Sequence, residues 1–106
     1  MNERHELHPL TPAQSEFAAL HHDLVFRYLH AGGLPEEEFY SEVILEYLAA
    51  VQEYDERPQL RAKDFQSVAF AAMDRAATNY REDRDRLRAR EISLRDPALL
   101  EFAFAA

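Results

Sequence analysis

The chain has 106 residues, of which 47% are hydrophobic, enough to build the core of one domain of ordinary size. It contains no cysteine, which excludes a disulfide framework, a thiolate metal site and a cysteine nucleophile, and which fits a reducing compartment. Only two glycines are present. Because all-β folds need many turns, and turns often need glycine, this composition favours helices.

The net charge of −8 is divided unevenly along the chain. Residues 1–56 carry two arginines against twelve acidic residues, whereas residues 57–95 carry ten basic residues against six acidic ones. Either the protein has two faces for different partners, or a solvated acidic helix is followed by a solvated helix of mixed charge.

The N-terminus carries no apolar run typical of a signal peptide. No segment reaches the roughly 18 uninterrupted apolar residues that a membrane helix needs. We therefore expect a cytoplasmic protein that does not associate with membranes.

Residues 1–10 are polar and without periodicity, and we expect them to be a flexible lead. Thr11 is followed by a proline and, three residues later, by Gln14, which is typical of a capped helix start. Apolar residues at helical spacing then predict one helix that ends at Gly32 and Gly33.

A second helix is expected from Pro35 to about Tyr54, with an apolar stripe on one side and glutamates on the other. A third helix should begin after Asp64, carry an alanine-rich inner stripe as far as Tyr80, and continue as a charged segment that projects into solvent. Residues 92–95 look like a loop, and a short last helix is expected from Asp96.

The predicted fold class is therefore all-α. We expect a small bundle of three main helices over residues 11–92, followed by a loop and a short C-terminal helix over residues 93–106.

An ordered series of short motifs, from position 23 to about position 86, resembles region 2 of bacterial RNA polymerase sigma factors. The matching features of the second helix are its acidic start, Glu42, Ala50-Val51 and an aromatic-Asp ending. After a short loop come Phe65-Gln66-Ser67-Val68-Ala69, Met73-Asp74-Arg75 and Asn79-Tyr80-Arg81. The two glycines and the glutamine that the family places in its second helix are absent.

The resemblance implies a sigma region 2-like fold and a role in transcription initiation. In that family the second helix docks on the clamp helices of the largest subunit of core RNA polymerase, and an acidic row suits an arginine-bearing partner. Alternatively, the glutamates only keep the surface of the helix solvated, and Leu48 lies in the core. The positions carried over as polymerase-binding are Glu38, Ser41, Glu42, Leu45 and Leu48.

The resemblance also implies contacts to promoter −10 DNA from the third helix and the loop before it, where basic residues neutralise phosphates and aromatic rings stack on bases. The candidates are Arg61, Lys63, Phe70, Arg75 and Arg81, whereas Phe65 is assigned to the core. Val68, Ala71 and Ala72 replace the aromatic residues of primary sigma factors, and Asp74 stands where these often carry arginine. Too few residues follow position 96 for a helix-turn-helix, so we expect a partner protein to supply that domain.

The five histidines are not spaced for a shared metal ion, and no catalytic constellation or phosphate-binding loop is recognisable. We expect no metal, no cofactor and no enzymatic activity. Two functions remain open: a sigma-like initiation subunit that contacts polymerase and promoter DNA, and a helical adaptor or sigma mimic that binds polymerase or an anti-sigma factor without reading DNA.

Overall fold

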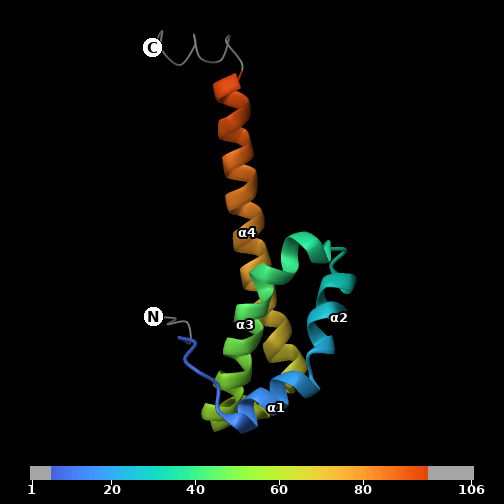
Figure 1. The fold of residues 1–106 in the computed structure, drawn as a ribbon, viewed down its shortest axis with the longest axis vertical. Helices are drawn as coiled ribbons and strands as arrows, with labels where there is room; N and C mark the ends of the chain where they lie inside the picture. Colours follow the sequence, from blue (N-terminus) through green and yellow to red (C-terminus); the bar gives the residue numbers. More distant parts are fainter. Residues whose placement is uncertain (1–5, 96–106) are drawn as a thin grey trace.

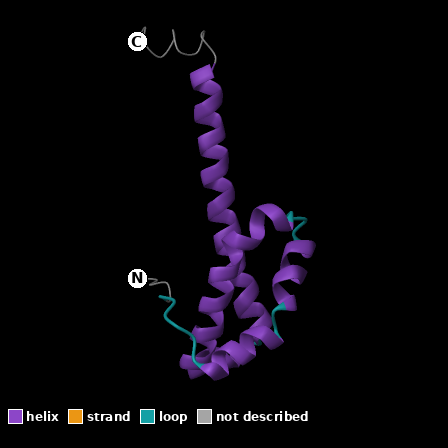
Figure 2. Ribbon diagram, viewed as in Figure 1, coloured by secondary structure: helices purple, strands orange, loops and turns teal. Residues whose placement is uncertain are grey.

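The computed structural model describes residues 6–95, with side chains described through residue 92. Within that range the protein is all-helical and contains no strand, which confirms the predicted class (Figures 1 and 2). The elements are α1 (Pro12–Leu20), α2 (Asp23–Ala31), α3 (Glu36–Glu56), the short 3₁₀ helix η1 (Pro58–Ala62) and α4 (Phe65–Arg95). The short helix predicted after residue 95 lies outside the described residues.

The single helix predicted before Gly32 is wrong, because the chain forms α1 and α2 with a tight turn between them. Its predicted start is confirmed: Thr11 and Gln14 cap each other reciprocally over 3.0 and 3.1 Å. At the other end, the His22 amide donates to the carbonyl of Ala19, three residues back, which tightens the last turn. The break lets α1 pack on α3, while α2 packs on both α3 and α4.

The predicted stop after α2 is confirmed. Gly33 has a φ of +64°, in the left-handed region that favours glycine. The Leu34 amide then bonds to the Leu29 carbonyl over 2.8 Å, which satisfies a carbonyl at the end of the helix. The chain reverses here, so α3 runs back beside α2 (Figure 1).

The core is centred on α3 and α4. Phe39, Val43 and Tyr47 of α3 are buried. The inner stripe predicted for α4 is buried or half-buried, and Phe65 lies in the core as expected. The small alanines of this stripe let the two helices approach closely.

Helix α4 begins where predicted, because the Asp64 carboxylate accepts the Ser67 amide over 2.8 Å. The loop predicted over residues 92–95 is wrong, since α4 continues to Arg95. No proline or glycine interrupts residues 65–95, and the first breaker is Pro97. The second half of α4 extends well beyond the bundle and gives a molecule of 59 × 31 × 24 Å (Figure 1).

Part of the N-terminal lead is held against α3. The Gln52 side chain, which is fully buried, bonds to the backbone of His8 in both directions, over 3.2 Å to its amide and 2.6 Å to its carbonyl. The His8 ring also lies 3.0 Å from the Glu56 carboxylate. His8 is therefore held against α3, and Leu10 packs against the core.

Candidate functional site

The five polymerase-binding candidates lie on one face of α3. Each of them lies three or four positions from another member of the set, which places them along the same side of a helix. Ser41, Glu42 and Leu45 are exposed, and Leu45 exposes 58% of its surface. Glu38 and Leu48 are half-buried, and Leu48 also packs against the core. We call this set of five residues the docking face.

Glu38 is already engaged by α4. Its carboxylate accepts a hydrogen bond from Arg84 over 2.7 Å and another from the Tyr80 hydroxyl over 2.9 Å. These two bonds, that from Arg84 first, hold the pKa of Glu38 below its ordinary value. The Arg84 guanidinium also lies 5.9 Å from the ring centroids of Phe39 and Tyr80. Arg84 therefore partly neutralises one end of the docking face.

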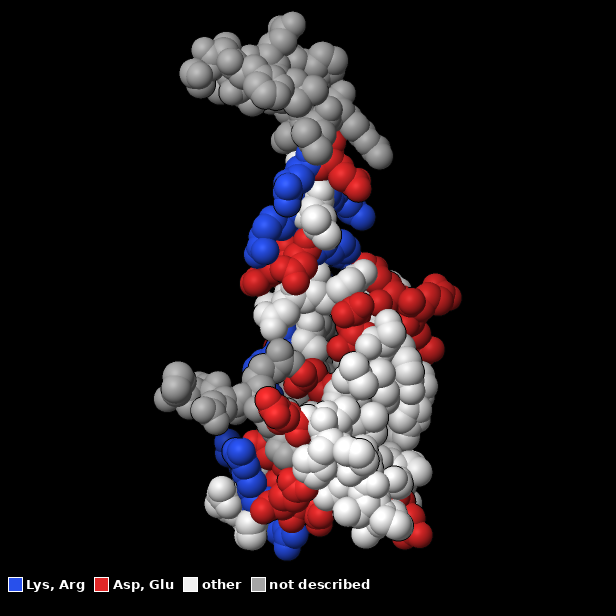
Figure 3. Space-filling view, turned by 60° about the vertical axis from the view of Figure 1, so that its left-hand side comes forward, with Lys and Arg blue, Asp and Glu red and all other residues white. Residues whose placement is uncertain are grey.

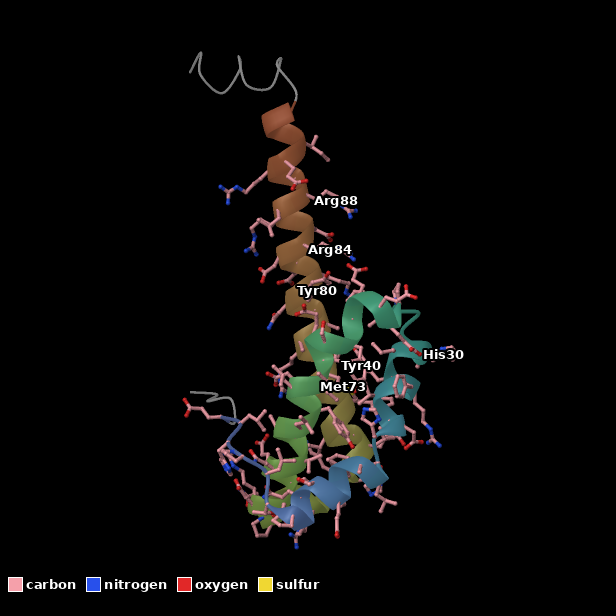
Figure 4. The ribbon with its side chains drawn as sticks, viewed as in Figure 1. His30, Tyr40, Met73, Tyr80, Arg84 and Arg88 are labelled. Atoms are coloured by element: carbon pink, nitrogen blue, oxygen red, sulfur yellow. The ribbon has the colours of Figure 1, made fainter. Side chains whose placement is uncertain are left out.

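No local pattern predicts the contact between Arg84 and Glu38, because the two residues are 46 positions apart. It depends on how α4 crosses the start of α3. Figure 4 shows Tyr80, Arg84 and Arg88 following one another along α4 at and beyond this crossing.

The start of α3 is strongly acidic. Glu36, Glu37 and Glu42 are exposed, and none of them has an ion-pair partner within residues 6–92. No lysine or arginine occurs between positions 28 and 56 to offset them. Figure 3 shows a dense group of acidic side chains near the point where α4 leaves the bundle, with a broad uncharged face below it. This arrangement suits a basic partner that also has apolar side chains.

Two of the DNA-binding candidates share a groove. Lys63 and Arg75 line a hollow of about 240 Å³ between η1 and α4, together with Ser67 and Glu53. The Glu53 carboxylate is paired with Arg57 at 3.2 Å. Two cations and a hydroxyl on one open groove can receive a phosphate group.

The other three DNA-binding candidates lie elsewhere. Arg61 donates to the Asp55 carbonyl over 3.2 Å and lines a separate, largely apolar pocket against α1. Phe70 is half-buried and packs edge-on against Tyr28, with ring centroids 5.6 Å apart. Arg81 is also half-buried, and its positive charge acts to lower the pKa of Tyr28. The five candidates therefore do not form one continuous surface.

Asp74, a departure from the family pattern, has a structural contact. Its carboxylate accepts a 3.0 Å hydrogen bond from the Tyr28 hydroxyl. Burial and this bond raise the pKa of Tyr28 to about 12. The acidic side chain thus links α4 to α2 and adds a negative charge beside Phe70.

The described histidines are distributed over different contacts. The His22 ring lies 2.7 Å from the Tyr40 hydroxyl, and His21 packs between Phe17 and Phe65. Among residues 6–95, no group of three or more histidine, aspartate and glutamate side chains is placed to hold a metal ion. In the same range, no helix is both long and apolar enough to cross a bilayer.

Comparisons with protein-family models, curated proteins and solved structures returned no match for this chain. The described residues thus form an all-helical bundle with an acidic and partly apolar outer face on α3 and a projecting, charged α4.

Proposed function

We propose that the chain is a sigma region 2-like subunit of transcription initiation that docks on core RNA polymerase through the outer face of α3. The observation that carries the proposal is the position of the five docking-face residues. The resemblance selected them by sequence position alone, and they lie together on one side of a single helix. Three of the five are exposed, as a binding surface requires.

The chemistry of the docking face suits an arginine-bearing helix such as a polymerase clamp helix. Glu42 presents a free carboxylate to a guanidinium, and Ser41 adds a hydroxyl beside it. Leu45 supplies exposed apolar area that contact with a partner would remove from water. Glu38 contributes less than its position suggests, because Arg84 already pairs with it.

Contact with promoter −10 DNA is assigned to the groove of Lys63 and Arg75. In this role the two side chains bind backbone phosphates and carry no sequence information. Recognition of a promoter then needs a helix-turn-helix domain from outside these 106 residues.

The alternative function is that of a helical adaptor or sigma mimic, which binds polymerase or an anti-sigma factor without reading DNA. The distribution of the DNA-binding candidates favours it, because Arg61 lines a separate pocket and Phe70 packs against Tyr28 instead of lining the groove of Lys63 and Arg75. The place of Asp74 beside Phe70 favours it too, because a carboxylate repels phosphate.

Co-elution of the purified chain with core RNA polymerase tests the docking proposal. We expect native binding to be abolished by Glu42→Arg and reduced by Leu45→Ala. Glu16→Arg, an equal change of charge at an exposed position of α1, should leave binding intact. A native chain that fails to co-elute at micromolar concentration, or a Glu42→Arg variant that binds normally, would refute the proposal.

Binding of the polymerase complex to DNA containing a −10 element separates the two functions. The sigma-like function predicts that joint replacement of Lys63 and Arg75 by alanine weakens DNA binding and lowers its dependence on salt. Joint replacement of Arg86 and Arg90 by alanine, on the projecting part of α4, is the charge-matched control. If the variant that lacks Lys63 and Arg75 behaves as the native chain, the adaptor function is favoured.

A further inference from the structure

A pair of stacked aromatic rings lies at the surface between α2 and α3. Phe26 and Tyr40 have ring centroids 5.7 Å apart and planes inclined by only 20°. The His22 ring meets Phe26 edge-on at 5.3 Å, and its Nε2 lies 2.7 Å from the Tyr40 hydroxyl. Phe26 still exposes 38% of its surface, which is unusual for a phenylalanine in so small a bundle. We call Phe26 and Tyr40 the aromatic shelf.

The shelf is continuous with the docking face. Tyr40, Ile44 and Leu48 follow one another at four-residue intervals along one flank of α3, and Tyr40 is the member of this row that stacks on Phe26 of α2. Leu48 belongs to the docking face, so the two surfaces meet along this helix. A partner lying across α3 can therefore reach both.

The surroundings of the shelf attract a cation. Glu36 and Glu37 lie one helical turn before Tyr40, and both are exposed without an ion-pair partner among the described residues. The nearest basic residue in the sequence, Arg27, pairs with Asp23 over 3.1 Å. The shelf thus combines aromatic rings with unpaired carboxylates.

The protein already binds one arginine in this way. Arg84 lies over the rings of Phe39 and Tyr80 while it pairs with Glu38. A guanidinium suits such a site because it can stack on a ring and still donate hydrogen bonds at its edge. The shelf offers the same components at the surface, with the arginine missing.

We propose that the aromatic shelf is a second part of the docking surface and that it receives an arginine side chain from a helix of the protein partner. The guanidinium packs on the exposed ring of Phe26 and pairs with Glu36 or Glu37. That the partner is core RNA polymerase rests on the proposed function, whereas the preference for arginine follows from the shelf itself.

The first test compares Phe26→Ala and Phe26→Leu with the native chain in binding to core RNA polymerase. Both variants should weaken binding about three- to tenfold, because each removes the ring from a cation–π contact. Leu87→Ala, which removes an exposed apolar side chain from the projecting part of α4, should have no effect. Circular dichroism confirms that each variant is folded. Native-like binding by Phe26→Leu would mean that the contact is only apolar and would overturn the proposal.

The second test does not depend on polymerase. The chain is titrated with a helical peptide that carries two arginines one turn apart, and with its lysine counterpart, while NMR follows the ring signals of Phe26 and Tyr40. We expect the arginine peptide to shift the ring signals of Phe26 and Tyr40, and the lysine peptide to shift them much less. In Phe26→Ala, the Tyr40 signals should not shift with either peptide. Unchanged ring signals, or equal shifts with both peptides, would overturn the proposal. If polymerase does not bind but the arginine peptide shifts the rings, the proposed function fails and the shelf assignment stands.

Discussion

Tyr47 is the largest fully buried side chain among the described residues, and its hydroxyl joins α3 to α1. It donates a 2.6 Å hydrogen bond to the Ala18 carbonyl within the core. If the donor is removed and the carbonyl stays buried, water cannot replace the lost hydrogen bond. The free energy of unfolding then falls by the cost of an unsatisfied buried acceptor.

Replacing Tyr47 by phenylalanine should lower the free energy of unfolding by about 1–3 kcal/mol, because the Ala18 carbonyl stays buried without a donor. Urea denaturation measures the change. The matched control is Tyr54→Phe, which removes a 3.0 Å bond to the exposed Lys63 carbonyl, where water can replace the hydroxyl. Equal losses from the two variants would contradict this explanation.

The helix α4 serves two purposes along its length. Its first half supplies buried residues such as Ala69 and Met73 to the core. Its second half leaves the bundle, and within the described part it is tied back to α3 by the bonds from Tyr80 and Arg84 to Glu38. This contact therefore links the helix assigned to DNA with the helix assigned to polymerase.

Arg84→Ala should raise the pKa of Glu38 toward its ordinary value, because it removes the largest cause of the lowered pKa. A lowered carboxylate pKa stabilises the fold above the unfolded-state pKa, and that stabilisation is lost as the pH falls. The variant should therefore lose less stability than the native chain on acidification. NMR titration of the Glu38 carboxyl carbon measures the pKa directly.

The control for this prediction is Arg86→Ala, since Arg86 pairs with Asp83 on α4 itself at 3.3 Å. It should leave the titration of Glu38 unchanged. A Glu38 pKa that stays low in Arg84→Ala would show that the Tyr80 bond alone suffices.

At the scale of the whole molecule, alkaline pH should destabilise the fold through its buried tyrosines. The pKa values of Tyr28 and Tyr47 are each raised to about 12, in both cases mainly by burial. Unfolding restores the ordinary value of about 10. Between these values the unfolded chain binds fewer protons than the folded one, so stability falls as the pH rises.

We therefore expect the urea midpoint to decline from about pH 10 toward pH 12. Tyr28→Phe should make the decline shallower, because it removes one of the tyrosines whose pKa is raised, a group that also includes Tyr47 and Tyr80. Lys63 is the only lysine in the chain, so lysine side chains contribute little to the titration in this range. Absorbance of tyrosinate should follow the same unfolding, and a midpoint that stays constant through pH 12 would contradict the prediction.

The helical class, the cap at Thr11, the glycine stop before α3 and the start of α4 after Asp64 could all be predicted from the amino-acid sequence. These features depend on residues a few positions apart, whose spacing is visible in the chain. The shared face of the docking residues is also a local property, because one helix holds all five.

Features that join distant segments could not be predicted from the sequence, because they depend on tertiary packing. The turn at His21 and His22 contains no glycine or proline that would have predicted it. It separates α1, which packs on α3, from α2, which packs on both α3 and α4. The Arg84 contact and the stack of Phe26 on Tyr40 depend on how helices cross. Crossing angles are set by packing across the whole core, and no local pattern of residues encodes them.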